Sequence, residues 1–144
     1  MALTDLHAQQ IAALLNERNH QLTIQYNAQR IRDHEENYLY RLSETNEVAA
    51  CVEVKKVQWY QTEVLHLTVA KSEVGKGHAK ALLCEAERVS RAHGARLLQC
   101  TIRDGNKESR SLFEGFGFID VSTFNNPSSG NNVGIYQKVL SSAL

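Results

Sequence analysis

The sequence contains little proline, few cysteines and no surplus of either charge, and each shortage excludes a class of protein. One proline and eight glycines in 144 residues are too few for a collagen-like or disordered chain, and 42% hydrophobic residues are typical of a globular one. Sixteen basic residues balance sixteen acidic ones, so the chain lacks the positive charge with which proteins neutralise nucleic-acid phosphates. Its length fits one domain, which we expect to span residues 1–144.

Cysteine and histidine are too sparse to form a metal site or a disulfide framework. Cys51, Cys84 and Cys100 are far apart, and the six histidines are scattered. Structural zinc and disulfide scaffolds use closely spaced ligands, so we expect no metal, and free thiols suit a reducing compartment. The chain begins without a basic segment followed by an apolar one, and its apolar runs are too short to span a bilayer. We therefore expect a cytoplasmic protein that binds neither nucleic acid nor membranes.

Hydrophobic spacing in the first half predicts helices and then a hairpin. Thr4 can cap a helix with an apolar face of Leu6, Ile11, Leu14 and Leu15. An alternating stretch with Leu22, Ile24 and Tyr26 follows, and residues 27–37 suit a second short helix. The period then changes to two, which predicts strands over residues 38–42 and 48–54, joined by a polar turn over residues 43–47.

The second half predicts strands that alternate with helices. The continuous apolar run of residues 64–69 is typical of a strand covered on both faces. A loop over residues 71–77 leads into a helix over residues 77–93, which Gly94 ends. Further strands are expected over residues 95–102, 118–124 and 135–139, with an Asn106-capped helix to Glu114 and a loop over residues 125–134. This order predicts a mixed α/β fold with strand–helix–strand crossovers. The inward face of the long helix is expected to carry Ala79, Leu82, Leu83, Ala86 and Val89.

The loop before the long helix has the character of an anion site. The first backbone N–H groups of a helix lack internal partners, and the helix dipole is positive there. Gly75 and Gly77 allow close approach of the backbone to a phosphate, Ala79 keeps the first turn slim, and Lys76 and Lys80 add positive charge. Two glycines before a helix are equally compatible with an ordinary loop. The segment matches neither a phosphate-binding P-loop nor a complete dinucleotide fingerprint.

Two motifs resemble those of the GNAT superfamily of N-acetyltransferases. Residues 74–79 fit the pyrophosphate motif [R/Q]-x-x-G-x-[G/A] through Gly77 and Ala79, although Val74 replaces the usual arginine or glutamine. About 30 residues later, residues 106–118 fit N-x-x-[A/S]-x-x-L-[Y/F]-x-x-x-G-F closely. The resemblance covers roughly residues 38–139. It implies a mixed, mostly antiparallel sheet of six or seven strands flanked by helices.

The resemblance also implies where acetyl-CoA would bind. In such enzymes the fourth strand splays from the fifth, and the pantetheine pairs with strand backbone, here at Leu67 and Val69. The pyrophosphate would lie on the loop amides, and His78 would contribute its backbone. Asn106 would reach the pantetheine or the substrate, and Phe113 and Phe116 would pack near the cofactor. The complete set of expected cofactor-binding residues is Leu67, Thr68, Val69, Val74, Gly75, Lys76, Gly77, His78, Ala79, Lys80, Asn106, Ser109, Phe113 and Phe116.

Two residues are candidates for the base that amine acetylation requires. Glu63 lies four residues before Leu67 on the expected strand face, and some histone-acetylating members of the resembled family place a glutamate at this offset; a solvated strand start is the alternative. His66 has a suitable intrinsic pKa, but it is also compatible with a half-buried residue on the opposite face. Cys100 could lie by the thioester or be a small buried hydrophobe, and Trp59 and Tyr60 could line an acceptor pocket or belong to the core.

The leading hypothesis is transfer of an acetyl group from acetyl-CoA to a primary amine, by direct attack in a ternary complex. Two departures from the family motifs keep open a second hypothesis, a non-catalytic acyl-CoA-binding module. They are Val74 and Phe113, and at position 113 the family usually has tyrosine. A binding domain for another phosphorylated ligand is a third interpretation. Two-fold oligomers are common, so we expect a homodimer in which residues 135–140 form part of the interface.

Overall fold

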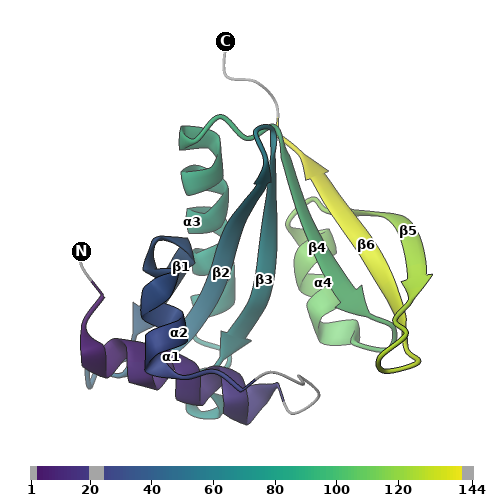
Figure 1. The fold of residues 1–144 in the computed structure, drawn as a ribbon. Helices are drawn as coiled ribbons and strands as arrows, with labels where there is room; N and C mark the ends of the chain where they lie inside the picture. Colours follow the sequence, from purple (N-terminus) through teal and green to yellow (C-terminus); the bar gives the residue numbers. More distant parts are fainter. Residues whose placement is uncertain (1–2, 20–24, 141–144) are drawn as a thin grey trace. The chain divides into compact units, whose positions relative to one another are not determined.

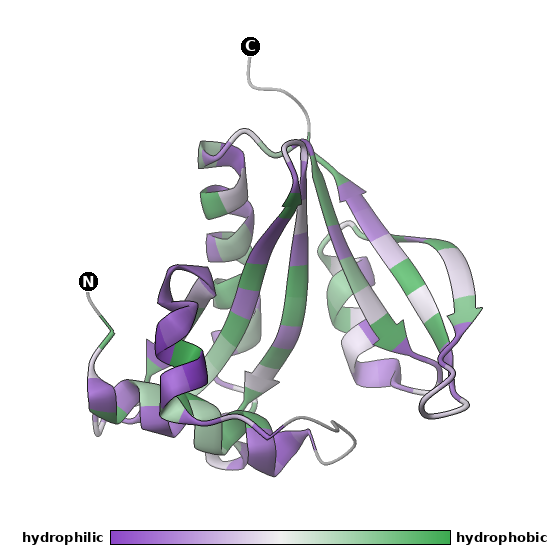
Figure 2. Ribbon diagram, in the orientation of Figure 1, coloured by the Kyte–Doolittle hydropathy of each residue, from purple (hydrophilic) through white to green (hydrophobic). Residues whose placement is uncertain are grey.

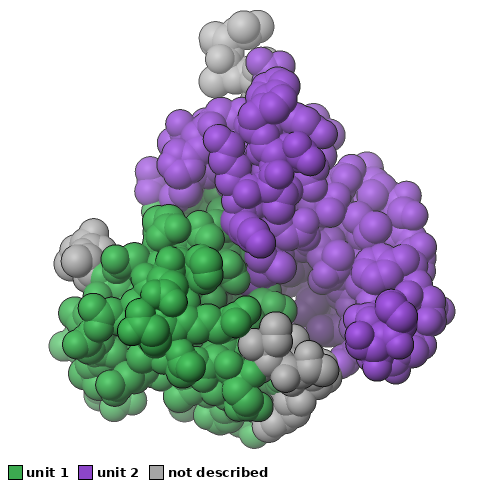
Figure 3. Space-filling model, in the orientation of Figure 1, with its two compact units in different colours: residues 1–54, 66–86 green, residues 55–65, 87–144 purple. Residues whose placement is uncertain are grey.

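The computed structural model describes residues 3–19 and 25–140. The described residues form two compact units, one from residues 1–54 and 66–86 and the other from residues 55–65 and 87–144 (Figure 3). We call them unit 1 and unit 2. Four α-helices occur in the described part of the chain: α1 (Asp5–Arg18), α2 (Ala28–Asp33), α3 (His78–Ala92) and α4 (Lys107–Gly115). Short 3₁₀ turns cover Glu35–Asn37 and Lys71–Glu73. The strands are β1 (Tyr38–Leu42), β2 (Val48–Gln58), β3 (Gln61–Val69), β4 (Leu97–Arg103), β5 (Ile119–Asn125) and β6 (Asn132–Val139).

These strands form one mixed sheet in the order β1-β2-β3-β4-β6-β5 (Figure 1). The pairings β1–β2, β4–β6 and β5–β6 are antiparallel, whereas β3–β4 is parallel. The parallel pairing covers only Gln61–Glu63 against Leu97–Gln99. The predicted fold class, a mostly antiparallel sheet flanked by helices, is confirmed, with strands in the lower of the two expected numbers.

Unit 1 packs α1 and α2 against β1 and β2. Thr4 caps α1 as expected, because its hydroxyl accepts a hydrogen bond from the backbone N–H of His7 at 3.1 Å. The predicted inward face is correct at Ile11, Leu14 and Leu15 but wrong at Leu6, which is 58% exposed. Leu6 lies in the first turn of α1, and its side chain stays outside the core. The core of this unit consists of Ala8, Ile11, Ala12, Leu14, Leu15, Ile31, Tyr38, Val48 and Cys51.

The short helix and the hairpin of unit 1 are also confirmed. The predicted helix within residues 27–37 is α2, which Asn27 caps by accepting from the N–H of Arg30 at 2.8 Å. The turn over residues 43–47 is closed by the Ser43 N–H, which donates to the Glu47 carbonyl at 2.8 Å. Of the alternating stretch, Leu22 and Ile24 lie outside the described residues, and Tyr26 is half-buried.

Unit 2 places α4 against one face of the ribbon formed by β4, β6 and β5 (Figure 1). Alternate strand residues point to opposite faces. The register therefore puts Glu63, Gln99, Gln137 and Ile119 in one row, and Cys100, Tyr136 and Asp120 in a row on the opposite face. Arg110 of α4 lines one pocket with Asp120 and Tyr136, so α4 lies on the face that carries Tyr136, and Glu63 lies on the opposite face of unit 2.

Several predicted boundaries shift in the structure. β3 begins at Gln61 rather than residue 64, and its burial alternates, with Thr62, Val64 and Thr68 buried, so it is not covered on both faces. β6 begins at Asn132, inside the expected loop, because Asn125 and Asn132 are paired across β5 and β6. Along α3, Leu82, Leu83 and Ala86 are buried, whereas Ala79 and Val89 are half-buried. Figure 2 shows apolar residues alternating with polar ones along the strands.

Candidate functional site

The loop before α3 exposes a run of unpaired backbone donors. Gly75 and Gly77 both adopt left-handed backbone conformations, with φ of 85° and 84°. None of the N–H groups of residues 75–80 donates a hydrogen bond to another described residue. A Cβ built at either glycine would meet no atom within 4 Å. Consecutive free N–H groups beside the positive end of a 15-residue helix favour an anion. The anion site itself stays a prediction.

Hydrogen bonds between side chains hold this loop in place. The His78 ring is 8% exposed; its Nδ1 accepts from Arg41 Nε at 3.0 Å, and its Nε2 lies 3.0 Å from Glu73 Oε1. Because Nδ1 accepts, Nε2 carries the proton and donates to the carboxylate. Lys76 Nζ donates to the other oxygen of Glu73 at 2.9 Å. His78 therefore contributes a side chain as well as a backbone N–H, and it connects the first residue of α3 to β1 and to the preceding 3₁₀ turn.

Charges in the loop are locally balanced. Hydrogen bonds from Lys76 and then His78 hold the pKa of Glu73 below its usual value, and Glu73 raises the pKa of Lys76. Both partners therefore stay ionised near neutral pH. Val74, where the family motif usually has arginine or glutamine, is 54% exposed. A pocket of about 270 Å³ borders the loop, and its charged lining residues are Glu44, Glu47, Glu73 and Lys76.

The end of β3 leads into this loop and contains one unusual backbone conformation. His66 has a φ of 52°, a left-handed value within a strand. Thr68 is buried, and its hydroxyl donates to the His66 carbonyl at 2.8 Å and accepts from Asn19 Nδ2 at 3.2 Å. The alternation of side chains between the two faces of a strand is interrupted at such a residue. The expectation that Glu63 and Leu67 lie on the same face of β3 therefore stays a prediction. Burial lowers the pKa of His66, and its ring packs edge-on against Tyr26 with centroids 6.2 Å apart.

Glu63 lies in unit 2 at the start of a hydrogen-bonded chain of side chains. Gln99 Nε2 donates to Glu63 Oε1 at 3.1 Å, and Gln137 Nε2 donates to Gln99 Oε1 at 2.7 Å. Burial raises the pKa of Glu63, and the hydrogen bond from Gln99 partly opposes that rise. Glu63 is thus half-buried and hydrogen-bonded rather than fully solvated, and its role as a base stays a prediction. A half-buried carboxylate with a raised pKa is a stronger base than an exposed one.

The second motif of the sequence forms α4 and its cap. Asn106 Oδ1 accepts from the Ser109 N–H at 3.2 Å, which confirms the predicted N-cap. Phe113 is 6% exposed and packs edge-on against Phe118, with ring centroids 5.1 Å apart. Lys138 Nζ lies 4.3 Å from the centre of the Phe116 ring. The aromatic residues of this motif thus hold α4 to its own unit, and their role toward a cofactor stays a prediction.

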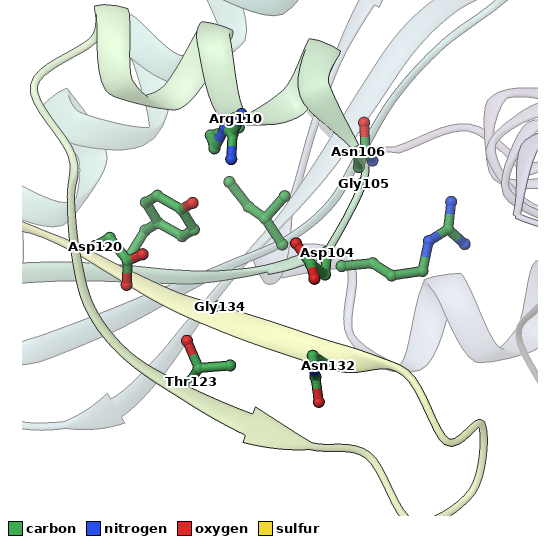
Figure 4. Close-up of a pocket in the computed structure, with 11 residues that line it drawn as sticks. Asp104, Gly105, Asn106, Arg110, Asp120, Thr123, Asn132 and Gly134 are labelled. Atoms are coloured by element: carbon green, nitrogen blue, oxygen red, sulfur yellow. The ribbon is translucent and has the colours of Figure 1, made fainter.

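A polar pocket of about 130 Å³ lies in unit 2 beside this cap (Figure 4). It is lined by the cap Asn106, Arg110 of α4, Asp104, Asp120 and Thr123 of β5, and Asn132 of β6. Tyr136 also lines it; burial raises the pKa of its phenol, as do the charges of Asp120 and Glu114. The phenol therefore stays protonated near neutral pH.

Other candidates from the sequence are resolved individually. Cys100 is 2% exposed, and burial raises the pKa of its thiol to about 12, so it is a small buried hydrophobe. Trp59 and Tyr60 are 69% and 37% exposed and do not belong to the core. All three cysteines are free. In the described part of the chain, no three His, Cys, Asp or Glu side chains gather as a metal site would require, and no helix is long and apolar enough to cross a membrane.

The structure places the predicted residues in two groups. Unit 1 contains the loop residues, the end of β3 and His66, whereas unit 2 contains Glu63 and the α4 motif. Sequence reasoning missed Arg41, Gln99 and Gln137. No local signal identifies them, since each acts through a partner at least 36 positions away.

Comparisons with known proteins agree with these observations. Residues 3–118 match the acetyltransferase (GNAT) family. A ribosomal-protein-alanine N-acetyltransferase from Brucella melitensis superposes with a TM-score of 0.82 at 18% identity, over 95% of this chain and 96% of that one. Ard1 from Thermoplasma volcanium gives 0.83 at 15% identity, over 98% and 96%. A chain of the NatC complex bound to Gag peptide and CoA gives 0.81 at 16%, over 96% and 93%. A search of curated proteins finds no sequence that matches this chain.

Proposed function

Because the chain belongs to the acetyltransferase (GNAT) family and is an acetyl-CoA-dependent acyltransferase, we propose that its acceptor is a primary amine, which attacks acetyl-CoA directly in a ternary complex. The observation that carries this proposal is the run of unpaired N–H groups at residues 75–80. Such a run favours a phosphate, because the partial positive charge of the N–H groups and of the helix N-terminus attracts an anion.

The loop would hold the pyrophosphate of acetyl-CoA through the amides of residues 74–80. Lys76 and Lys80 would add charge, and the absence of side chains at Gly75 and Gly77 leaves the approach open. Leu67, Thr68 and Val69 would present strand backbone to the pantetheine. By resemblance, Asn106, Ser109, Phe113 and Phe116 are the further residues expected to bind the cofactor. Acetyl-CoA supplies the acyl group as a thioester, which an uncharged amine can attack.

Glu63 would be the base that removes the proton from the acceptor amine. Its raised pKa and its half-buried position, on the face of unit 2 opposite to α4, support this role. His66 is the second candidate, because burial keeps its ring neutral at physiological pH. Phe113 has no acidic proton, so the thiolate would leave without a tyrosine acid, which its moderate basicity allows.

We further propose that both units belong to one acetyltransferase domain, since the family match runs continuously across every boundary between them. A cytoplasmic location is consistent with three free thiols. A homodimer is supported by the apolar edge of unit 2, where Ile119 and Val139 are 62% and 76% exposed. Residues 135–140 would form part of that interface.

A non-catalytic acyl-CoA-binding module is the second candidate function. Val74 and Phe113, the two departures from the family motifs, favour it. Binding of CoA would then be retained without acetyl transfer.

The test is CoA release from acetyl-CoA in the presence of a panel of amines, including peptide N-termini, lysine, polyamines and amino acids. The proposal expects thiol release that depends on the amine, with the N-acetylated product in equal amount and intersecting initial-rate patterns. Parallel patterns would reject direct attack. CoA binding by calorimetry without release with any amine would favour the binding module.

A further inference from the structure

The chain of side-chain amides next to Glu63 spans three strands of unit 2. Glu63 on β3, Gln99 on β4 and Gln137 on β6 are paired in register, so their side chains share one row on one face of the sheet. All three are half-buried. The two hydrogen bonds, at 3.1 and 2.7 Å, connect them end to end.

The ionised carboxylate gives this chain a direction. A carboxylate only accepts hydrogen bonds, so Gln99 must turn its NH₂ group toward Glu63. The side-chain carbonyl oxygen of Gln99 then faces away from Glu63, and the NH₂ group of Gln137 donates a hydrogen bond to it. If Gln137 did not hold that carbonyl, the Gln99 amide could rotate and present the wrong end.

The contact uses only one of the two carboxylate oxygens. Gln99 binds Oε1 of Glu63, and no other described side chain or backbone group donates to Oε2. One oxygen is therefore oriented and the other is available. A base needs this arrangement, because proton transfer depends on the direction of the accepting lone pair as well as on its pKa.

We infer that Gln99 and Gln137 are positioning residues that hold Oε1 of Glu63 and thereby direct Oε2 toward the proton of the acceptor amine. This inference rests on the proposed role of Glu63 as the base. A purely structural cross-strand ladder would stabilise the sheet equally well, but it would not tune the carboxylate.

Few other groups influence this carboxylate. The titratable side chains of β2 are Cys51, Glu53, Lys55 and Lys56, of which the two lysines are exposed. Those of β4 are Cys100 and Arg103. The pKa of the Cys100 thiol is raised to about 12, so it stays neutral. Burial and the Gln99 hydrogen bond are thus the two influences on the pKa of Glu63.

The test replaces each glutamine by methionine, which has a similar length but no donor. Gln99→Met removes the hydrogen bond that favours the ionised form, so the pKa of the Glu63 carboxyl should rise. Gln137→Met touches no atom of Glu63, and it should raise that pKa less, through the loosened Gln99 amide. Gln61→Met is the matched control, because Gln61 lies on β3 two residues before Glu63 and outside the chain; it should change nothing.

Two readouts separate the possible outcomes. Carbon-13 NMR titration of the Glu63 carboxyl, assigned with Glu63→Gln, needs no activity. The acidic limb of the pH profile of kcat/KM should move to higher pH by the same amount as the pKa of Glu63, because the base must be ionised. Near neutral pH, kcat should fall about tenfold in Gln99→Met and about threefold in Gln137→Met, with KM for acetyl-CoA unchanged.

An unchanged Glu63 titration in Gln99→Met would overturn the inference whatever the activity. A shifted titration without a matching shift in the kcat/KM profile would also overturn it, and would locate the failure in the base role of Glu63 rather than in the amide chain. Thermal unfolding of each variant identifies any loss of fold. A change in stability alone, with both pH readouts unchanged, would show that the hydrogen bonds among Glu63, Gln99 and Gln137 only stabilise the sheet.

Discussion

Gly77→Glu places a carboxylate where the pyrophosphate of acetyl-CoA is proposed to lie. Gly77 has a φ of 84°, and a Cβ there meets no atom within 4 Å. The new side chain therefore creates no clash, and it introduces backbone strain of about 1–2 kcal/mol, the cost of a left-handed conformation for a residue with a Cβ. The added charge points into the run of unpaired amides.

The effect on binding follows from Coulomb's law. Two like charges 4 Å apart repel by about 1 kcal/mol in bulk water and about 4 kcal/mol near a protein surface. With a doubly charged pyrophosphate and flexible glutamate, a loss of roughly 2–4 kcal/mol is expected, which weakens acetyl-CoA binding about 30- to 1000-fold. At ordinary working concentrations this amounts to loss of binding.

Gly94→Glu is the matched control. Gly94 follows α3 with a φ of 85°, and a Cβ there also meets no atom within 4 Å. Both variants should therefore lose similar free energy of unfolding, as measured by denaturant titration. Isothermal titration calorimetry with acetyl-CoA should show near wild-type affinity for Gly94→Glu and none for Gly77→Glu. Equal affinities in two folded variants would refute the assignment of the loop.

The remaining predictions concern catalysis and assembly. Glu63→Gln should lower kcat by about 10²–10⁴ with little change in KM for acetyl-CoA; because burial raises the pKa of Glu63, its charge opposes folding at neutral pH, so the same variant should raise the free energy of unfolding at pH 7. Near full kcat would transfer the base role to His66 or to an amine that arrives deprotonated. Phe113→Tyr should raise kcat up to about tenfold by supplying an acid to the leaving thiolate, and stopped-flow turnover no faster than wild type would reject the leaving-group argument. Light scattering should show a dimer at micromolar concentration; a monomer would contradict the proposed interface.

Much of the fold follows from local sequence signals. Thr4 and Asn106 were predicted as caps, and each accepts a hydrogen bond from the N–H group three residues later. Gly94 ends α3 with a φ of 85°, as a helix C-terminal glycine does. The hairpin and the crossovers followed from the change of hydrophobic period.

Features that depend on long-range register could not be predicted. Gln99 and Gln137 are ordinary polar strand residues until β4 and β6 are aligned, and only then do they form a chain to Glu63. Arg41 acquires a role through His78, 37 positions away. The left-handed backbone at His66 has no sequence signal either, since histidine does not favour it as glycine does.

The central claim is acetyl transfer to an amine, and a proton NMR time course of acetyl-CoA with the intact protein and a mixture of primary amines tests it most directly. The account predicts that the methyl signal of the thioester disappears and an acetamide methyl signal grows at the same rate. It also predicts that both changes slow markedly with Glu63→Gln. A thioester signal that persists with every amine, while calorimetry shows that acetyl-CoA is bound, would contradict the account.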